Sequence, residues 1–101
     1  MEVKNGKIYK YAPATVLEDQ EAHKKTVFGA KQEINAYIYP ASGQVQAKQY
    51  GKELPYIMNL LTNENKLEEG YGLCVYGDDV DYVVISIKIY SAHYLCEIKK
   101  L

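Results

Sequence analysis

The sequence contains no arginine and no tryptophan, and it has a single phenylalanine. All twelve basic residues are therefore lysines, and with thirteen acidic residues they leave a formal net charge of −1. The planar guanidinium group is the usual donor for bidentate recognition of guanine and phosphate, so its absence disfavours that kind of nucleic-acid readout. A charge near zero likewise gives no general attraction to nucleic acid or to an anionic membrane.

Cysteine and long apolar runs are also scarce. The two cysteines, Cys74 and Cys96, lie in apolar alternations without CxxC spacing, so we expect buried thiols in a reducing compartment. No stretch approaches the roughly 20 apolar residues of a membrane-spanning helix. Residues 1–11 lack the apolar segment of a signal peptide, which predicts synthesis in the cytosol.

Tyrosine, by contrast, is abundant, with eleven among 101 residues. Many of these tyrosines lie in short runs in which apolar and polar residues alternate, as in strands that are buried on one face. A chain of this length forms one domain. We therefore predict an all-β fold, a small barrel or sandwich of six to seven short, mostly antiparallel strands with little helix. The expected strands lie at residues 6–12, 32–39, 45–50, 54–62, 71–77, 82–90 and 94–98.

The final hairpin, "VDYVVISIKIYSAHYLCEIKKL", contains the longest alternation and is expected to supply the centre of the core. A strand with one β-branched face beside a mixed face is typical of burial on one side. We expect Ile87→Asp to unfold the domain, because it would bury an unpaired charge. The predicted core residues are Ile34, Ile38, Val83, Ile85, Ile87 and Ile89.

Between residues 12 and 30 the alternation disappears. Thr15 and Glu18 have the spacing of a capping box, which favours a short helix through residues 17–25; a mobile arm is the alternative. We accordingly assign residues 1–31 to an N-terminal strand followed by a flexible arm or loop. Residues 32–101 are assigned to the barrel core, and the whole chain to a single domain.

Candidate catalytic and metal-binding residues do not form a recognisable motif. Asp78, Asp79 and Asp81 lack the glycine and glutamate positions of a calcium loop, so we interpret them as turn residues. His23 and His93 have no HExxH spacing, and strand parity would place His93 and Cys96 on opposite faces. We predict no enzyme, no metal and no cofactor.

One binding function is compatible with the composition. Small barrels bind single-stranded nucleic acid through stacked aromatic and basic side chains, and "AYIYP" and "QAKQYGK" contain both kinds of residue. The alternative is that Tyr37, Tyr39 and Tyr50 pack against a neighbouring subunit or cover a sheet face.

The C-terminal third, from "LEEGYG" through "LCVYG" and an acidic turn to "DYVVISIKIYSAHYLCEIKK", resembles the head–tail connector proteins of long-tailed bacteriophages. These proteins are also called head-completion, stopper or minor capsid proteins. The segment "TVFGAKQEINAYIYPASGQVQAKQYGKELPY", with Gly51, is similar to the earlier strands of that family. Tyr71 stands where the family has aspartate, and the chain has no basic run that would line a channel. The other positions that carry the resemblance are Gly70, Gly72, Tyr82, Val84, Tyr90, His93 and Ile98.

The resemblance implies a small β-barrel or sandwich that assembles as a ring beneath the portal, closes the DNA-filled head and receives the tail. The implied partners are copies of the same chain, a portal or adaptor protein above and a tail protein below, near packaged DNA but without sequence-specific binding. The implied location is the virion, after assembly in the host cytoplasm. A head–tail adaptor or tail-terminator ring is a close alternative. The residues that we expect at subunit or partner interfaces are Tyr37, Tyr39, Tyr50, Tyr56, Tyr90, His93 and Tyr94.

Overall fold

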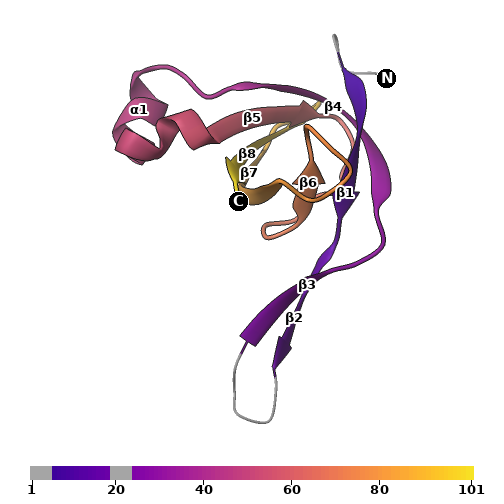
Figure 1. Ribbon diagram of the computed structural model, residues 1–101. Coiled ribbons are helices and arrows are strands. Elements are labelled where there is room, and N and C mark those ends of the chain that lie inside the picture. Colours follow the sequence, from indigo (N-terminus) through magenta and orange to yellow (C-terminus); the bar gives the residue numbers. More distant parts are fainter. Residues whose placement is uncertain (1–5, 19–23) are drawn as a thin grey trace.

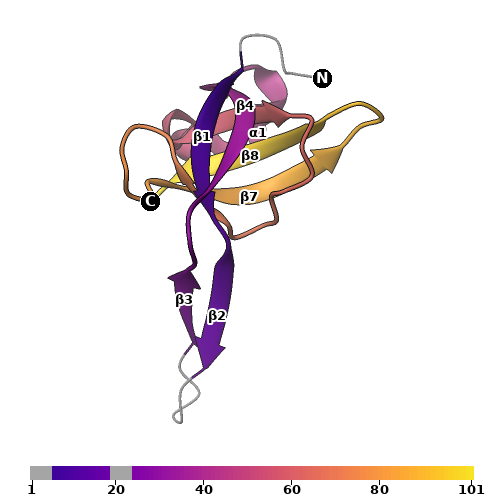
Figure 2. The same cartoon turned by 90° about the vertical axis from the view of Figure 1, so that its right-hand side faces the viewer.

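The computed structural model describes residues 6–18 and 24–101. Six antiparallel strands close into a barrel in the order β1-β4-β5-β8-β7-β6, and β2 and β3 form a separate hairpin that projects from it (Figure 1, Figure 2). The predicted all-β fold is confirmed. In chain order, the elements are β1 (Lys7–Ala12), β2 (Ala14–Glu18), β3 (Lys24–Phe28), β4 (Gln32–Pro40), α1 (Gln44–Tyr50), the 3-10 helix η1 (Gly51–Tyr56), β5 (Ile57–Thr62), β6 (Gly72–Cys74), β7 (Tyr82–Ile89) and β8 (Tyr94–Lys100).

The interior of the barrel is filled by alternate residues of its strands. On β4, Ile34 and Ala36 are completely buried, and Ile38 packs against the core, while Tyr37 points outward. The prediction for Ile34 is therefore confirmed, and Ile38 lies at the margin of the core. The barrel starts with β1, so it begins at Lys7 and not at residue 32 as predicted. The buried cluster comprises Tyr11, Ile34, Ala36, Leu60, Leu67, Leu73, Tyr82, Val84, Cys96 and Ile98.

The predicted inward face of the last hairpin is wrong for most of β7. The pairing of β7 with β8 shifts between Val84 and Ser86, which leaves Ile85 as the extra residue of a β-bulge. Before the bulge Tyr82 and Val84 face the core, and after it Ile87 does, because one extra residue reverses the parity. Val83 and Ile85 are half-buried on the outside. Ile89 lies next to the turn that closes the hairpin and is 76% exposed.

The segment predicted as a helix or mobile arm forms a β-hairpin in its described part. Val16 pairs with Thr26, and Leu17 with Lys25, in an antiparallel ladder. Thr15, the expected cap residue, lies within β2, so the helical prediction is wrong there. The centre of the predicted helix, including His23, lies outside the described residues.

The predicted strand at residues 45–50 is also wrong, because these residues form helix α1. The sequence QVQAKQY contains several good helix formers and carries polar groups at five of its seven positions, so no face demands burial within a sheet. Gly43 and Gly51 flank the helix with positive φ values of 92° and 56°, which other residues adopt at a cost. Within the described residues, neither helix is long and apolar enough to cross a membrane.

Candidate interaction surfaces

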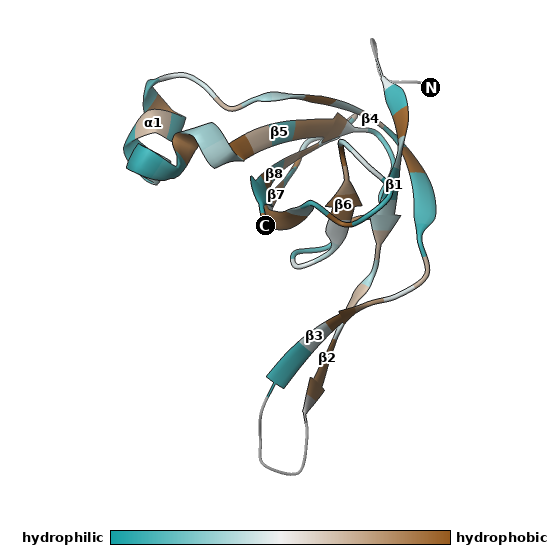
Figure 3. Cartoon of the chain, viewed as in Figure 1, coloured by the Kyte–Doolittle hydropathy of each residue, from teal (hydrophilic) through white to brown (hydrophobic). Residues whose placement is uncertain are grey.

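The β2–β3 hairpin, here called the arm, is the most conspicuous surface feature of the molecule. It leaves the barrel at Pro13 and Gly29, where the Gly29 N–H donates to the Pro13 carbonyl over 2.7 Å. Figure 3 shows apolar residues along much of the arm, with a hydrophilic segment at the start of β3. Val16 is 61% exposed, Leu17 54% and Val27 38%. Three aliphatic side chains on one short hairpin are therefore exposed, two of them by more than half.

The ladder of the arm assigns each of these side chains to a face. Residues directly opposite in a ladder lie on the same face, and successive residues alternate. Leu17 and Lys25 therefore share one face with Val27, whereas Val16 lies on the other. Among the described strands, β2 and β3 pair only with each other, so both outer edges of the arm are open.

A second surface consists of aromatic residues on the outside of the barrel. Tyr37 and Tyr39 stack with ring centroids 5.1 Å apart, and Tyr90 stacks on His93 at 4.8 Å. Burial raises the pKa of Tyr39, and the neighbouring Tyr37 and Tyr90 raise it further. The two stacked pairs are therefore close enough to interact electrostatically. Four residues expected at an interface are brought together in this way.

The other three residues expected at interfaces lie elsewhere. Tyr50 ends α1, and its hydroxyl bonds to the buried Glu97 carboxylate; burial and this bond raise the pKa of Tyr50 to about 12. Tyr56 is 52% exposed at the end of η1. Tyr94 is half-buried at the start of β8, opposite Ile89. They do not extend the aromatic surface.

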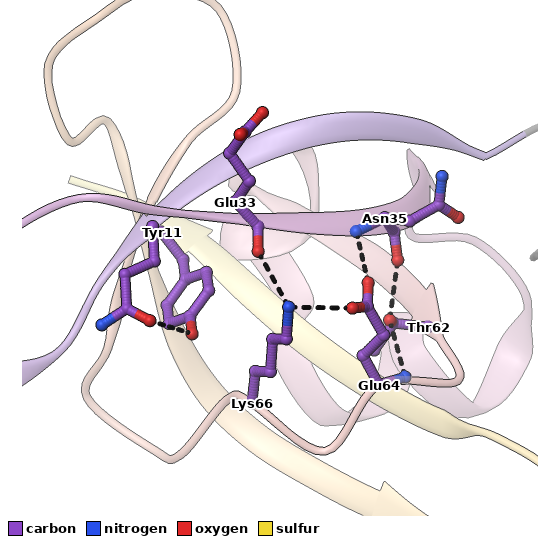
Figure 4. Close-up of polar contacts among 7 residues, drawn as sticks. Tyr11, Glu33, Asn35, Thr62, Glu64 and Lys66 are labelled. Atoms are coloured by element: carbon purple, nitrogen blue, oxygen red, sulfur yellow. Dashed lines mark hydrogen bonds and ion pairs between the residues drawn. The ribbon is translucent and has the colours of Figure 1, made fainter.

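An open pocket of about 690 Å³ lies beside β4 where β5 ends. Figure 4 shows the side chains of Thr62, Glu64 and Lys66 bound to the backbone of β4, in the place where a paired strand would bind it. The Asn35 N–H donates to Glu64 Oε2 over 2.6 Å, and Thr62 Oγ1 donates to the Asn35 carbonyl over 2.7 Å. Lys66 Nζ lies 2.9 Å from Glu64 Oε1 and 3.3 Å from the Glu33 carbonyl. The pocket is lined by Ile8, Glu33, Ile34, Asn35, Asn63, Glu64, Lys66 and Ala92.

Sequence patterns did not identify this polar cluster. Thr62 and Glu64 lie where a strand gives way to a polar turn, and that composition is common to many turns. Hydrogen bonds from Lys66 and from the Asn35 N–H lower the pKa of Glu64. The carboxylate is thus held in its charged form, bound both to a lysine and to the backbone of β4.

In the acidic turn after β6, Asp81 has a structural role. Asp81 accepts hydrogen bonds from the N–H groups of Val75 and Tyr76, at 2.8 and 2.9 Å. Within residues 6–18 and 24–101, no group of three or more His, Cys, Asp or Glu side chains is placed to hold a metal ion. Both cysteines are buried and unpaired with one another, and burial raises their pKa, to about 11 for Cys96.

Comparison of the chain with models of known protein families, with curated proteins and with solved structures finds no match.

Proposed function

We propose that this chain is a structural virion protein that forms a homo-oligomeric ring at the head–tail junction of a long-tailed bacteriophage. In that role the ring closes the DNA-filled head and joins it to the tail. Its partners are copies of itself, a portal or adaptor protein on one side and a tail protein on the other.

The observation that carries the proposal is the presence of two separate surfaces on one closed barrel. The arm presents the exposed Leu17 and Val27 on one of its faces, and the aromatic surface presents Tyr37 and Tyr90 on the outside of the barrel wall. Neighbours in a ring meet head to tail, so each copy needs two different contact surfaces. Contacts to proteins above and below the ring add to that need.

The positions that carry the sequence resemblance also have definable roles. Gly70 has a φ of 91° and donates its N–H to the Val84 carbonyl over 2.8 Å, which fixes the loop before β6. Tyr82 and Ile98 are buried in the barrel. Tyr90 and His93 lie at the tip of the β7–β8 hairpin. The resemblance therefore involves both the framework and a surface, as expected for a protein that works through contacts.

Electron microscopy of lysates from a phage that lacks this gene tests the proposal. We expect separate heads and free tails, and a plasmid copy of the gene should restore complete particles. Emptied heads among the separate parts would identify the ring as a stopper. Normal tailed particles would refute the proposal, and single-stranded nucleic-acid binding with a steep salt dependence would then be the function to test.

A further inference from the structure

We propose that the arm of one copy docks into the open pocket of a second copy. The docking face is the one that carries Leu17, Val27 and Lys25, and the receiving residues are Ile8, Ala92 and Glu33. This contact would join neighbouring copies of the proposed ring, and to that extent the inference deepens the proposed function and rests on it.

The arm requires an external partner for a physical reason. A two-stranded hairpin alone is at best marginally stable in water, because it lacks a layer on which to bury its side chains. Phe28, at the base of the arm, lies close to the barrel: a Cβ added at Gly72 would meet its Cε1 at 3.1 Å. Leu17 and Val27 lie beyond that base on one face, and both are exposed. Covering this face would remove their apolar surface from water.

The pocket has the complementary composition. Ile8, which is 58% exposed, and the exposed Ala92 supply an apolar area at its margin. Lys66 is already bound to Glu64. The Glu33 carboxylate is exposed and points away from this cluster in Figure 4, so it is accessible to a cation from another chain. Lys10 lies opposite Glu33 in the ladder but does not line the pocket.

Charge and position together favour Lys25 as that cation. Lys25 lies directly opposite Leu17, on the same face of the arm, and is exposed. An exposed lysine beside an exposed leucine matches an exposed glutamate beside an exposed isoleucine. Complementary charges of this kind set the orientation of two docking surfaces and discriminate against wrong partners.

The arm does not reach the pocket of its own barrel. It follows the C-terminal end of β1 at Ala12, whereas Ile8 lies toward the other end of that strand, and both views show the arm extending away from the barrel (Figure 1, Figure 2). The two surfaces therefore meet only between copies. Because they differ, the contact is heterologous and can repeat from copy to copy, which produces a ring where the rotation between neighbours closes.

Sedimentation velocity over a series of protein concentrations tests the inference with the full chain. We expect the wild type to self-associate, and Leu17→Asp to weaken the association by at least about tenfold, because it places a charge in an apolar contact. The matched control is Val16→Asp, which introduces the same charge at the neighbouring position on the opposite face. It should leave the association unchanged.

A charge exchange gives a second readout that does not depend on apolar contacts. Lys25→Glu and Glu33→Lys should each weaken association, and the double variant should restore it, whereas Lys24→Glu, on the other face, should have no effect.

Any one of three results would overturn the inference: a wild type that stays monomeric, equal effects of Leu17→Asp and Val16→Asp, or absence of rescue in the charge-exchange double variant. If Leu17→Asp blocks particle formation although the wild type is monomeric, the arm binds a different protein. The connector proposal itself is judged separately, by the morphology of particles that lack the gene.

Discussion

Gln46 Nε2 donates a hydrogen bond to Glu97 Oε2 over 2.9 Å, and this bond fastens α1 to the outer face of the barrel. Gln46 also donates to Asn59 Oδ1 over 2.7 Å. Glu97 accepts a further hydrogen bond from Ser86 Oγ at 2.6 Å and one from the Tyr50 hydroxyl, and it is only 2% exposed. The helix thus covers a polar cluster on the barrel wall, and the carboxylate is its common acceptor.

Replacing that acceptor should destabilise the protein markedly. Glu97→Ala leaves the donors of Gln46, Ser86 and Tyr50 without their partner in a buried setting, and we expect a loss of about 2–4 kcal/mol in the free energy of unfolding. The measurement is urea denaturation at pH 7. Glu53→Ala is the control, because Glu53 forms an exposed ion pair with Lys99 over 3.1 Å. Such a pair contributes about 0–1 kcal/mol, and equal losses in the two variants would contradict the assignment.

The same carboxylate should make stability depend on pH. Burial alone would raise the pKa of Glu97, but hydrogen bonds from Ser86, Gln46 and Tyr50 outweigh it, so the pKa is lowered from its usual 4.5. The unfolded chain therefore binds a proton more readily than the folded one. This contribution is present above the unfolded pKa and is lost as pH falls through the lower folded value. Urea midpoints at pH 7 and pH 3 should differ less in Glu97→Gln than in the wild type.

Tyr50 should extend the pH dependence of stability to the alkaline side. Because its pKa is raised to about 12, the protonated phenol is favoured by folding. The stabilisation is complete below the ordinary value of 10 and is lost as pH rises through about 12. Spectrophotometric titration of tyrosinate should therefore show one group fewer near pH 12 in Tyr50→Phe than in the wild type. A loss of amplitude near the ordinary value of 10, with the curve near pH 12 unchanged, would contradict the raised pKa of Tyr50.

How far the sequence predicts the fold depends on which interactions decide each element. The alternation of Ile34 and Ala36 with Tyr37 is a local pattern, so β4 and its inward face could be read from it. The arm and α1 could not be predicted in this way, because "ATVLE" and "QVQAKQY" have no clear one-sided pattern. The strand pairing of the arm and the docking of α1 on the barrel depend on residues distant in the sequence. The candidate surfaces follow the same division. Tyr37 and Tyr39 were identifiable by parity, whereas the pocket around Glu64 arises where two strands separate.

The bulge on β7 yields a direct test of which residues form the core. Val84 is 2% exposed inside the barrel, whereas Ile89 is 76% exposed. Val84→Asp should therefore abolish cooperative thermal unfolding, because an unpaired charge in the core costs several kcal/mol, roughly the whole stability of a small domain. Ile89→Asp should melt like the wild type. If Ile89→Asp abolished cooperative unfolding and Val84→Asp did not, Ile89 and not Val84 would face the core, as the sequence alone predicts.

Gly72 lies at the junction between the barrel and the arm, so a methyl group added there would crowd side chains of both. A Cβ at this position would lie 2.6 Å from Val80 Cγ1 and 3.1 Å from Phe28 Cε1. We expect Gly72→Ala to lower the free energy of unfolding by about 1–3 kcal/mol, as overpacking does. Gly77→Ala, where nothing lies within 4 Å, is the matched control and should be nearly neutral.

Val80→Ala removes the closest of these atoms, so the double variant with Gly72→Ala should lose less stability than the two single losses added together. Additive losses in denaturation experiments would show that the contact with Val80 is not the cause.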